Sequence, residues 1–231
     1  MTAIMSSMGS AVEMSVGATS WYAWLDISGT AEVEKYDIDP ELLYGPVLSA
    51  KINDDFNLTF VFLYGVFNVK ETDTDGSVYK YDMSRIDSDI ALNYRLNSYF
   101  KLFIGGKYMS YKYKLDDFDY SGNDRAFGPG TGISVVLPIG GNFFLIGNVG
   151  GFYLWGKEDQ SGEYAEEPDA KFKDYGINTT ASIAYYIEPA STTINLGGRY
   201  QYLKSKYDGD EPDDTTKFYG ITLSATYSFS I

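Results

Sequence analysis

The sequence predicts an all-β protein, an up-and-down antiparallel transmembrane β-barrel of about ten strands. Three observations predict it. Apolar and polar residues alternate with a period of two from Val12 to the end of the chain. The strands of this pattern are joined alternately by very short turns and by long acidic loops. The chain is also rich in residues that suit a pleated sheet, with 22 Tyr, 14 Phe and 3 Trp, and has 24 Gly, a residue that weakens helices.

The predicted strands follow one another without a linker, so residues 12–231 are expected to form a single domain. No stretch reaches the roughly 18 consecutive apolar residues that a membrane-spanning helix needs, so strands would cross the membrane. The strands are expected at 12–25, 42–52, 56–70, 82–96, 100–115, 129–139, 143–157, 174–187, 192–207 and 216–231. Short turns are expected at 53–55, 97–99, 140–142 and 188–191, and long loops at 26–41, 71–81, 116–128, 158–173 and 208–215.

The three-residue turns test the alternation, because each fixes the register of its hairpin. Residues of the same parity then face each other on the two strands. One face of each hairpin is apolar and the other is mixed, as a lipid-facing outside and a packed inside require. The residue pairs expected on this basis are Leu96 with Phe100, Ile52 with Phe56, and Ile139 with Phe143.

The same parity places a polar set of side chains inside the barrel. The lumen-lining residues are expected to be Lys51, Arg85, Asp87, Asp89, Arg95, Lys101, Lys107, Asn148, Arg199 and Gln201, together with Trp21 and Glu188. Large apolar side chains should also point inward, namely Val47, Val61, Leu63, Phe103, Met109, Phe144, Ile146 and Phe152. Ten strands leave little more room than eight, whose interior side chains nearly fill. We therefore favour a largely filled lumen over an open pore, with an ion pair between Asp89 and Lys107.

The final strand has the most specific pattern in the chain. Aromatic and aliphatic residues from Tyr219 to Ile231 alternate with small polar ones, and Phe229 lies near the carboxyl end. This pattern resembles the C-terminal assembly signal of the porin-like small β-barrels of bacterial outer membranes, and the resemblance covers Val12 to Ile231. It implies a Gram-negative cell envelope, an outer-membrane location and both termini in the periplasm. The implied partners are outer-membrane lipid, lipopolysaccharide and the barrel-assembly machinery.

The absence of two residue types limits the possible chemistry. The chain has no Cys and no His. Omptin-type outer-membrane proteases are also ten-stranded barrels, but their site includes an Asp and His pair, and barrel lipases, deacylases and palmitoyl transferases use His as the general base near a Ser. We therefore expect a non-enzymatic protein with no catalytic residues and no cofactor. The net charge of −14 argues against a nucleic-acid partner.

The predicted long loops are strongly acidic. They hold 24 of the 32 Asp and Glu residues but only 5 of the 18 Lys and Arg residues. The best candidate for a loop-bound divalent cation has a spacing that partly resembles a calcium loop, and its residues are Glu71, Asp73, Asp75 and Asp82. A second acidic cluster contains Asp208, Asp210, Asp213 and Asp214. The alternative for both, which we favour, is a solvated loop.

Residues 1–11 differ from the rest of the chain, being small and rich in Met and Ser. They resemble the end of a secretory signal peptide that is cleaved after Ala11, and the alternative is a frayed N-terminus.

The sequence therefore favours a non-enzymatic integral outer-membrane barrel, either structural or a narrow porin-like passive channel for ions and small solutes. The alternative is a surface adhesin or binding protein that uses acidic extracellular loops and whose ligand is unknown.

Overall fold

The computed structural model describes residues 13–29, 33–115, 120–162, 170–208 and 213–230. The predicted segment 1–11 lies outside this part of the chain. The elements are β1 (Glu13–Ser28), β2 (Val33–Ile38), β3 (Glu41–Lys51), β4 (Phe56–Asp73), β5 (Val78–Arg95), β6 (Phe100–Leu115), β7 (Tyr120–Gly140), β8 (Phe143–Gly162), β9 (Ala170–Ile187), the 3-10 turn η1 (Glu188–Ala190), β10 (Thr192–Tyr207) and β11 (Asp214–Ser230).

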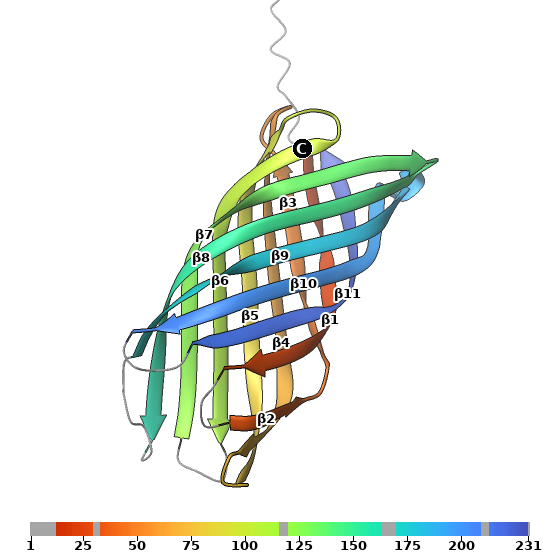
Figure 1. Cartoon of the computed structure of the whole chain (residues 1–231). Coiled ribbons are helices and arrows are strands. Elements are labelled where there is room, and N and C mark those ends of the chain that lie inside the picture. Colours follow the sequence, from red (N-terminus) through yellow and green to blue (C-terminus); the bar gives the residue numbers. More distant parts are fainter. Residues whose placement is uncertain (1–12, 30–32, 116–119, 163–169, 209–212, 231) are drawn as a thin grey trace, which may run out of the picture.

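The strands form one sheet that closes on itself (Figure 1). Strand β1 pairs with both β3 and β11, and each further strand pairs with its neighbours in the chain, always antiparallel. Strands β2 and β3 both pair with β4 and are separated only by Asp39 and Pro40, so together they act as one interrupted strand. The barrel is therefore ten-stranded, as the sequence predicted.

The turns at the end of the barrel near both chain ends explain how the sequence fixes the register. The side chain of Asn53 accepts hydrogen bonds from the backbone N–H groups of Asp55 and Phe56, a local turn that Asn forms readily. Asn97 caps the next short turn in the same way. The backbone N–H groups of Ile52 and Leu96 then donate to the carbonyl groups of Phe56 and Phe100 at 2.9 Å, as predicted.

The third predicted hairpin pair is wrong at its last residue. Leu137 faces Leu145 as expected, but Phe143 pairs with Gly140, because a bulge leaves Ile139 without a direct partner. The turn uses Gly140 and Gly141, whose φ angles of 138° and 56° suit glycine and few other residues. The bulge changes the geometry of the turn, but the same side chains of the two strands still point into and out of the barrel.

Most predicted long loops are largely strand in the structure. Strand β7 begins at Tyr120 and β8 runs to Gly162, so the loops predicted at 116–128 and 158–173 are shorter than expected. The loop predicted at 26–41 contains β2, and the loop at 71–81 is a β-hairpin with a tight turn between β4 and β5. The sequence placed these strand ends too early, because the strands continue past the apolar belt into a region where both faces are polar.

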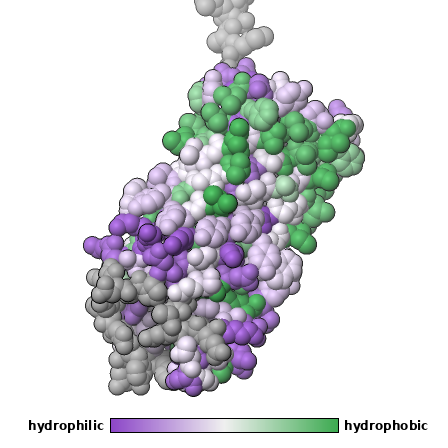
Figure 2. Space-filling model, viewed as in Figure 1, coloured by the Kyte–Doolittle hydropathy of each residue, from purple (hydrophilic) through white to green (hydrophobic). Residues whose placement is uncertain are grey.

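The outer surface divides the barrel into two halves. Figure 2 shows apolar residues gathered over the half near the short turns and hydrophilic residues over the half near the long loops. The boundary is a ring of outward aromatic residues, here called the aromatic girdle, made of Trp24, Tyr44, Tyr64, Tyr108, Phe127, Trp155, Tyr175, Tyr202 and Tyr219. We take the membrane-spanning segments to end at this girdle. Among the described residues, no helix is long and apolar enough to cross a membrane.

Beyond the girdle, the cations lie on outward positions, whereas several inward side chains are carboxylates. Outward positions hold cations, namely Lys112, Lys114, Arg125, Lys157, Lys171, Lys173, Lys204, Lys206 and Lys217. The residues beside several of them, such as Asp174 next to Lys173 and Glu158 next to Lys157, are buried inside. Because successive residues of a strand face opposite sides, one short sequence supplies both a cationic outer wall and an acidic interior.

Candidate functional site

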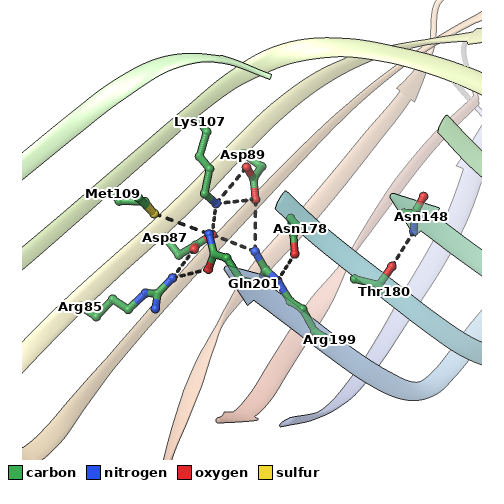
Figure 3. Close-up of polar contacts among 10 residues, drawn as sticks. All are labelled: Arg85, Asp87, Asp89, Lys107, Met109, Asn148, Asn178, Thr180, Arg199 and Gln201. Carbon is green, nitrogen blue, oxygen red and sulfur yellow. Dashed lines mark hydrogen bonds and ion pairs between the residues drawn. The ribbon is translucent and has the colours of Figure 1, made fainter. Parts of the chain in front are cut away.

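Charged side chains and one glutamine meet across the lumen near the girdle. We call this group the charge plug, and it consists of Arg85, Asp87, Asp89, Lys107, Arg199 and Gln201 (Figure 3). Arg85 donates to the Asp87 carboxylate at 2.7 Å and to the Gln201 side-chain carbonyl at 2.6 Å. Lys107 donates to Asp87 at 2.8 Å and to Asp89 at 3.2 Å. The ion pair expected between Asp89 and Lys107 is therefore present.

The contacts of the plug reach across the barrel. Arg199 on β10 donates to Asp87 on β5 at 3.1 Å, and also to the Asn178 side chain of β9 at 3.1 Å. In the order of the closed sheet, β10 and β5 lie five strands apart in either direction. They are therefore diametrically opposite, and a direct contact between their side chains spans the full width of the lumen.

Aromatic and aliphatic side chains fill the space around these charges. The Arg85 guanidinium carbon lies 3.4 Å from the ring centre of Phe218 and 5.4 Å from that of Tyr111. The Arg199 guanidinium lies 4.4 Å from the Trp21 ring centre. Such stacking stabilises cations that are removed from water. The fully or almost fully buried residues at this level include Trp21, Leu43, Leu63, Phe67, Met109, Leu154, Leu203 and Phe218.

The charges of the plug nearly balance, and burying them costs free energy because they lose their hydration. Asp87 is 1% exposed and forms ion pairs with three cations, Arg85, Lys107 and Arg199. Removing a charged group from water costs several kcal/mol, so such a group persists only where partners surround it. This network therefore depends on all of its members, and Asp87 is its centre.

A cavity of about 630 Å³ lies between the plug and the long-loop end of the barrel. We call it the tyrosine–carboxylate cavity. Its floor includes Tyr111 and Phe218, which also contact Arg85 of the plug. Its walls carry the carboxylates Glu71, Asp73, Asp124, Glu158, Asp174 and Asp214 and the tyrosines Tyr36, Tyr79, Tyr81, Tyr111, Tyr113, Tyr120 and Tyr207. None of its described lining residues is Lys or Arg.

Phenol groups donate hydrogen bonds to several of these carboxylates. Tyr81 donates to Glu71 at 2.9 Å, and Tyr113 donates to Glu158 at 3.1 Å. The ring of Tyr113 fits against the wall because Gly122 lies opposite it, where a Cβ atom would come within 2.2 Å of the tyrosine ring. A neutral hydrogen-bond donor orients a carboxylate but leaves its charge in place.

Asp174 and Asp124 line the cavity, and each has an oxygen atom that accepts no hydrogen bond from the described residues. Asp174 is 3% exposed and its Oδ1 atom has no donor, and the Oδ1 atom of Asp124 also has none. Burial, together with the neighbouring charge of Asp214, raises the pKa of Asp174 to about 6, although a hydrogen bond with Ser205 opposes the shift. Burial and the carboxylates around it raise the pKa of Asp124 well above its usual value. Both groups lie just beyond the aromatic girdle.

Other sequence-predicted residues line a smaller cavity of about 180 Å³ at the short-turn end. Lys51 pairs with Asp54 at 2.9 Å, and Arg95 lies 3.8 Å from Asp55, which supplies its carboxylate from a neighbouring turn. Lys101 lines the same cavity. Asn148, by contrast, lies in the barrel wall and donates to Thr180 at 2.7 Å, away from both the plug and the cavities (Figure 3).

The candidate cation residues Glu71, Asp73, Asp75 and Asp82 lie on a β-hairpin and not on a flexible loop. Glu71 and Asp73 line the tyrosine–carboxylate cavity, whereas Asp82 lies on the other face of the hairpin, in a groove with Asp37. Asp75 accepts a hydrogen bond from the backbone of Ser77 in the turn. Among the described residues, no three carboxylates converge as a metal site would require. In the second acidic cluster, Asp210 lies outside the described residues.

Sequence reasoning missed the carboxylates and tyrosines of the cavity beyond the girdle. It assigned 116–128 and 158–173 to loops, and so it did not extend the strand parity to Asp124, Glu158 or to the tyrosines beside them. The alternation does continue there, for example in Lys171-Phe172-Lys173-Asp174-Tyr175. A charged residue alternating with an apolar or oppositely charged one is the signal that identifies these positions as strand.

Comparison with known proteins supports the fold. No protein-family model matches the sequence, and no curated protein sequence matches it. The structure is similar to that of the outer-membrane protease OmpT of Escherichia coli, at 9% identity and a TM-score of 0.64, covering 96% of this chain and 98% of that one. The outer-membrane protein OprG of Pseudomonas aeruginosa matches at 11% identity and a TM-score of 0.47, covering 96% of each chain.

The closed ten-stranded barrel, its apolar belt and its aromatic girdle define a transmembrane β-barrel protein of the bacterial outer membrane. At 9% identity the likeness to OmpT extends to the fold alone. The function must therefore be argued from the side chains inside the barrel.

Proposed function

We propose that this protein is a non-enzymatic, sealed outer-membrane barrel that acts as a binding protein through its long-loop end. The observation that carries the proposal is the contact between Arg199 and Asp87 on opposite strands, which closes the lumen at the girdle. A sealed lumen leaves the tyrosine–carboxylate cavity open only toward the long loops. In the proposed orientation those loops face the exterior and both chain ends face the periplasm.

The outer wall supports the proposed setting. The cations just beyond the girdle, such as Lys112 and Lys173, lie on outward positions at the height where a bilayer's headgroups begin. Lipopolysaccharide phosphates would be suitable partners for them. The alternating final strand β11 would serve as the recognition element for the barrel-assembly machinery.

The residue inventory supports a non-enzymatic role. A hydrolase of the usual barrel type needs a base next to a nucleophile, and the sequence offers no His for that purpose. The cavity carboxylates lie on separate strands, with Asp124 on β7, Glu158 on β8 and Asp174 on β9.

Planar-bilayer recording tests the proposal. The wild-type barrel is expected to give no conductance steps above background, because the plug fills the cross-section. The double variant Arg199→Ala and Gln201→Ala removes the polar contacts of β10 with Arg85, Asp87 and Asp89 of β5 and is expected to produce openings. Well-resolved steps from the wild-type protein would refute the sealed barrel. The matched control is Asn148→Ala, which changes an inward polar residue outside the plug and should leave the barrel silent.

A gated channel is the second candidate. Its supporting observation is that cavities lie on both sides of the plug, so a local rearrangement of Lys107 and Arg199 would join them. Voltage-dependent or ligand-dependent openings of the wild-type barrel, rare but well resolved, would favour this function.

A further inference from the structure

The tyrosine–carboxylate cavity has no cation of its own. All 18 Lys and Arg residues of the chain lie within the described residues. Three belong to the charge plug and three line the short-turn cavity, and the others occupy outward or exposed positions. None lines the tyrosine–carboxylate cavity in the part of the chain that the structure describes.

The remaining segments cannot supply such a cation. Residues 1–12, 30–32, 116–119, 163–169, 209–212 and 231 contain no Lys or Arg, and they add ten Asp and Glu residues. This is a property of the sequence and does not depend on where these segments lie. The chain therefore concentrates six carboxylates around one cavity without a Lys or Arg residue among its walls.

A buried oxygen atom points to a missing partner. The Asp174 side chain is 3% exposed, lines the cavity and has an Oδ1 atom that accepts no hydrogen bond from the described residues. Buried polar atoms are nearly always satisfied in folded proteins, so an orphan acceptor in a cavity wall is a place where a ligand can donate a hydrogen bond. The Tyr111 hydroxyl at the cavity floor is also buried and has no hydrogen-bond partner in the described part of the chain.

The tyrosine rings supply a second kind of surface for a cation. The ring centres of Tyr81 and Tyr113 are 5.9 Å apart, and those of Tyr113 and Tyr120 are 6.1 Å apart. The face of an aromatic ring attracts ammonium and guanidinium groups, and more strongly where water is excluded. Carboxylates and ring faces together are the chemistry that recognises an organic cation.

The distribution of the carboxylates distinguishes organic cations from metal ions. The carboxylates lie on β4, β7, β8, β9 and β11, which surround the cavity, and among the described residues no three of them form a metal-binding group. A metal ion needs several oxygen ligands at one point. A ligand with cationic groups spaced along a chain can instead reach several walls, and about 630 Å³ is within the usual range for a small-molecule site.

We propose that the tyrosine–carboxylate cavity binds an organic polycation, a molecule with two or more ammonium or guanidinium groups. The inference rests on the proposed role of the long-loop end as a binding surface and names the chemical class of its ligand. Asp174 and Glu158 accept hydrogen bonds from the cationic groups, and the rings of Tyr81 and Tyr113 contact the ligand between them. A free polyamine and the basic side chains of a short peptide are two sources of this chemistry.

Isothermal titration calorimetry of the whole barrel in detergent micelles tests the proposal with spermine as the probe. Saturable binding at pH 7.5 is expected. Because burial and neighbouring carboxylates raise the pKa of Asp174 to about 6 and also raise the pKa of Asp124, a cation that binds at pH 6 should release protons from them. The binding heat should therefore depend on the ionisation enthalpy of the buffer, and affinity should fall at least several-fold between pH 7.5 and pH 5.

Two variants on β8 separate cavity binding from general attraction to an acidic protein. Glu158→Gln removes an inward charge, and Asp159→Asn removes the neighbouring outward charge, which pairs with Lys157 at 2.8 Å on the outer wall. Glu158→Gln combined with Asp174→Asn is expected to weaken spermine binding at least tenfold. Asp159→Asn should leave it unchanged. Equal losses from both changes would overturn the proposal.

Two further measurements identify the source of the cation. Both use wild-type protein, so they do not depend on whether a variant folds. A tetra-arginine peptide measured against wild-type protein shows whether a basic peptide is preferred to a free polyamine, and binding of either supports the proposal. Absence of binding by both overturns it, as does equal displacement of spermine by Mg²⁺ at the same charge concentration. Spermine binding to a barrel that also conducts would retain this inference and refute the sealed barrel.

Discussion

The charge plug and the tyrosine–carboxylate cavity are neighbouring parts of one lumen, and they treat buried charge in opposite ways. In the plug, Asp87 is surrounded by three cations. In the cavity, Asp174 is almost as buried, but no Lys or Arg among the described residues lines the cavity with it, and burial raises its pKa to about 6. A buried carboxylate without a cation, such as Asp174, does not stabilise the fold through an ion pair. The difference separates charges that hold the barrel together from charges that are available to a ligand.

The largest expected change in the free energy of unfolding comes from removing the central carboxylate of the plug. Asp87→Ala would leave Arg85, Lys107 and Arg199 without their shared carboxylate, and breaking a buried pair in this way typically costs about 3 to 5 kcal/mol. The free energy of unfolding, measured by urea titration in lipid vesicles, should fall by that amount. Asp174→Ala, the same change in the cavity, should cost far less. Equal losses would show that both regions are structural.

The next largest effect is a dependence of the stability of the fold on pH, caused by the carboxylates of the tyrosine–carboxylate cavity. A carboxyl with a raised pKa in the folded state binds its proton more tightly there than in the unfolded chain, so ionisation destabilises the fold. For Asp174, whose pKa is about 6, stability should therefore fall as the pH rises from about 4 to 6, by up to about 3 kcal/mol. Asp124, Glu158 and Asp214 face the same cavity, and the raised pKa of Asp124 acts in the same direction.

Unfolding midpoints at pH 4.5 and pH 7.5 measure this dependence. Asp174→Asn should be more stable than wild type at pH 7.5 and should show a smaller change with pH. A wild-type barrel that gains stability as the pH rises through this window would contradict the unbalanced cavity.

A smaller effect is expected where packing shapes the cavity. A Cβ atom at Gly122 would come within 2.2 Å of the Tyr113 ring, so Gly122→Ala should displace the ring and its hydrogen bond to Glu158. The expected loss is about 1 to 2 kcal/mol in the free energy of unfolding. Gly130→Ala on the same strand is the control, since its nearest non-neighbouring atom would be 3.4 Å away. Similar losses for both would mean that the Tyr113 ring is not held by Gly122.

The smallest change in stability is expected from breaking an ion pair on the outer wall. Lys173 pairs with Asp208 at 3.0 Å, but both side chains are about half exposed. Exposed ion pairs contribute little to stability because water and salt screen them. Lys173→Ala should therefore leave the unfolding midpoint unchanged within error, and a large shift would show that the outer wall is part of the fold's support.

The sequence predicts the barrel well because a strand with one lipid-facing side has a clear alternation. The facing of Leu96 and Phe100 and the inward position of Arg85 and Asp87 follow from parity alone. Parity does not reveal which inward residues meet across the lumen. The contact from Arg199 to Asp87 depends on β10 and β5 being opposite in the closed sheet, and that requires the strand count and the stagger of the barrel.

The cavity was missed for a different physical reason. Beyond the girdle the outer wall is no longer in contact with lipid, so charged residues such as Lys173 replace apolar ones on the outward face. The apolar alternation that identifies a strand then disappears, although the strand continues. Asp124 and Glu158 therefore read as loop residues in the sequence, and the acidic composition that suggested solvated loops is partly the lining of a cavity.

The central claim is that the plug divides the lumen into two separate compartments, and cysteine accessibility tests it most directly. The chain has no native Cys, so Ser205→Cys in the tyrosine–carboxylate cavity and Ser49→Cys in the short-turn cavity would each give a single thiol. Each variant is inserted into lipid vesicles in one orientation and treated with a small membrane-impermeant thiol reagent added only on the long-loop side. The account predicts labelling of Ser205→Cys and none of Ser49→Cys. Comparable labelling of both positions would contradict it.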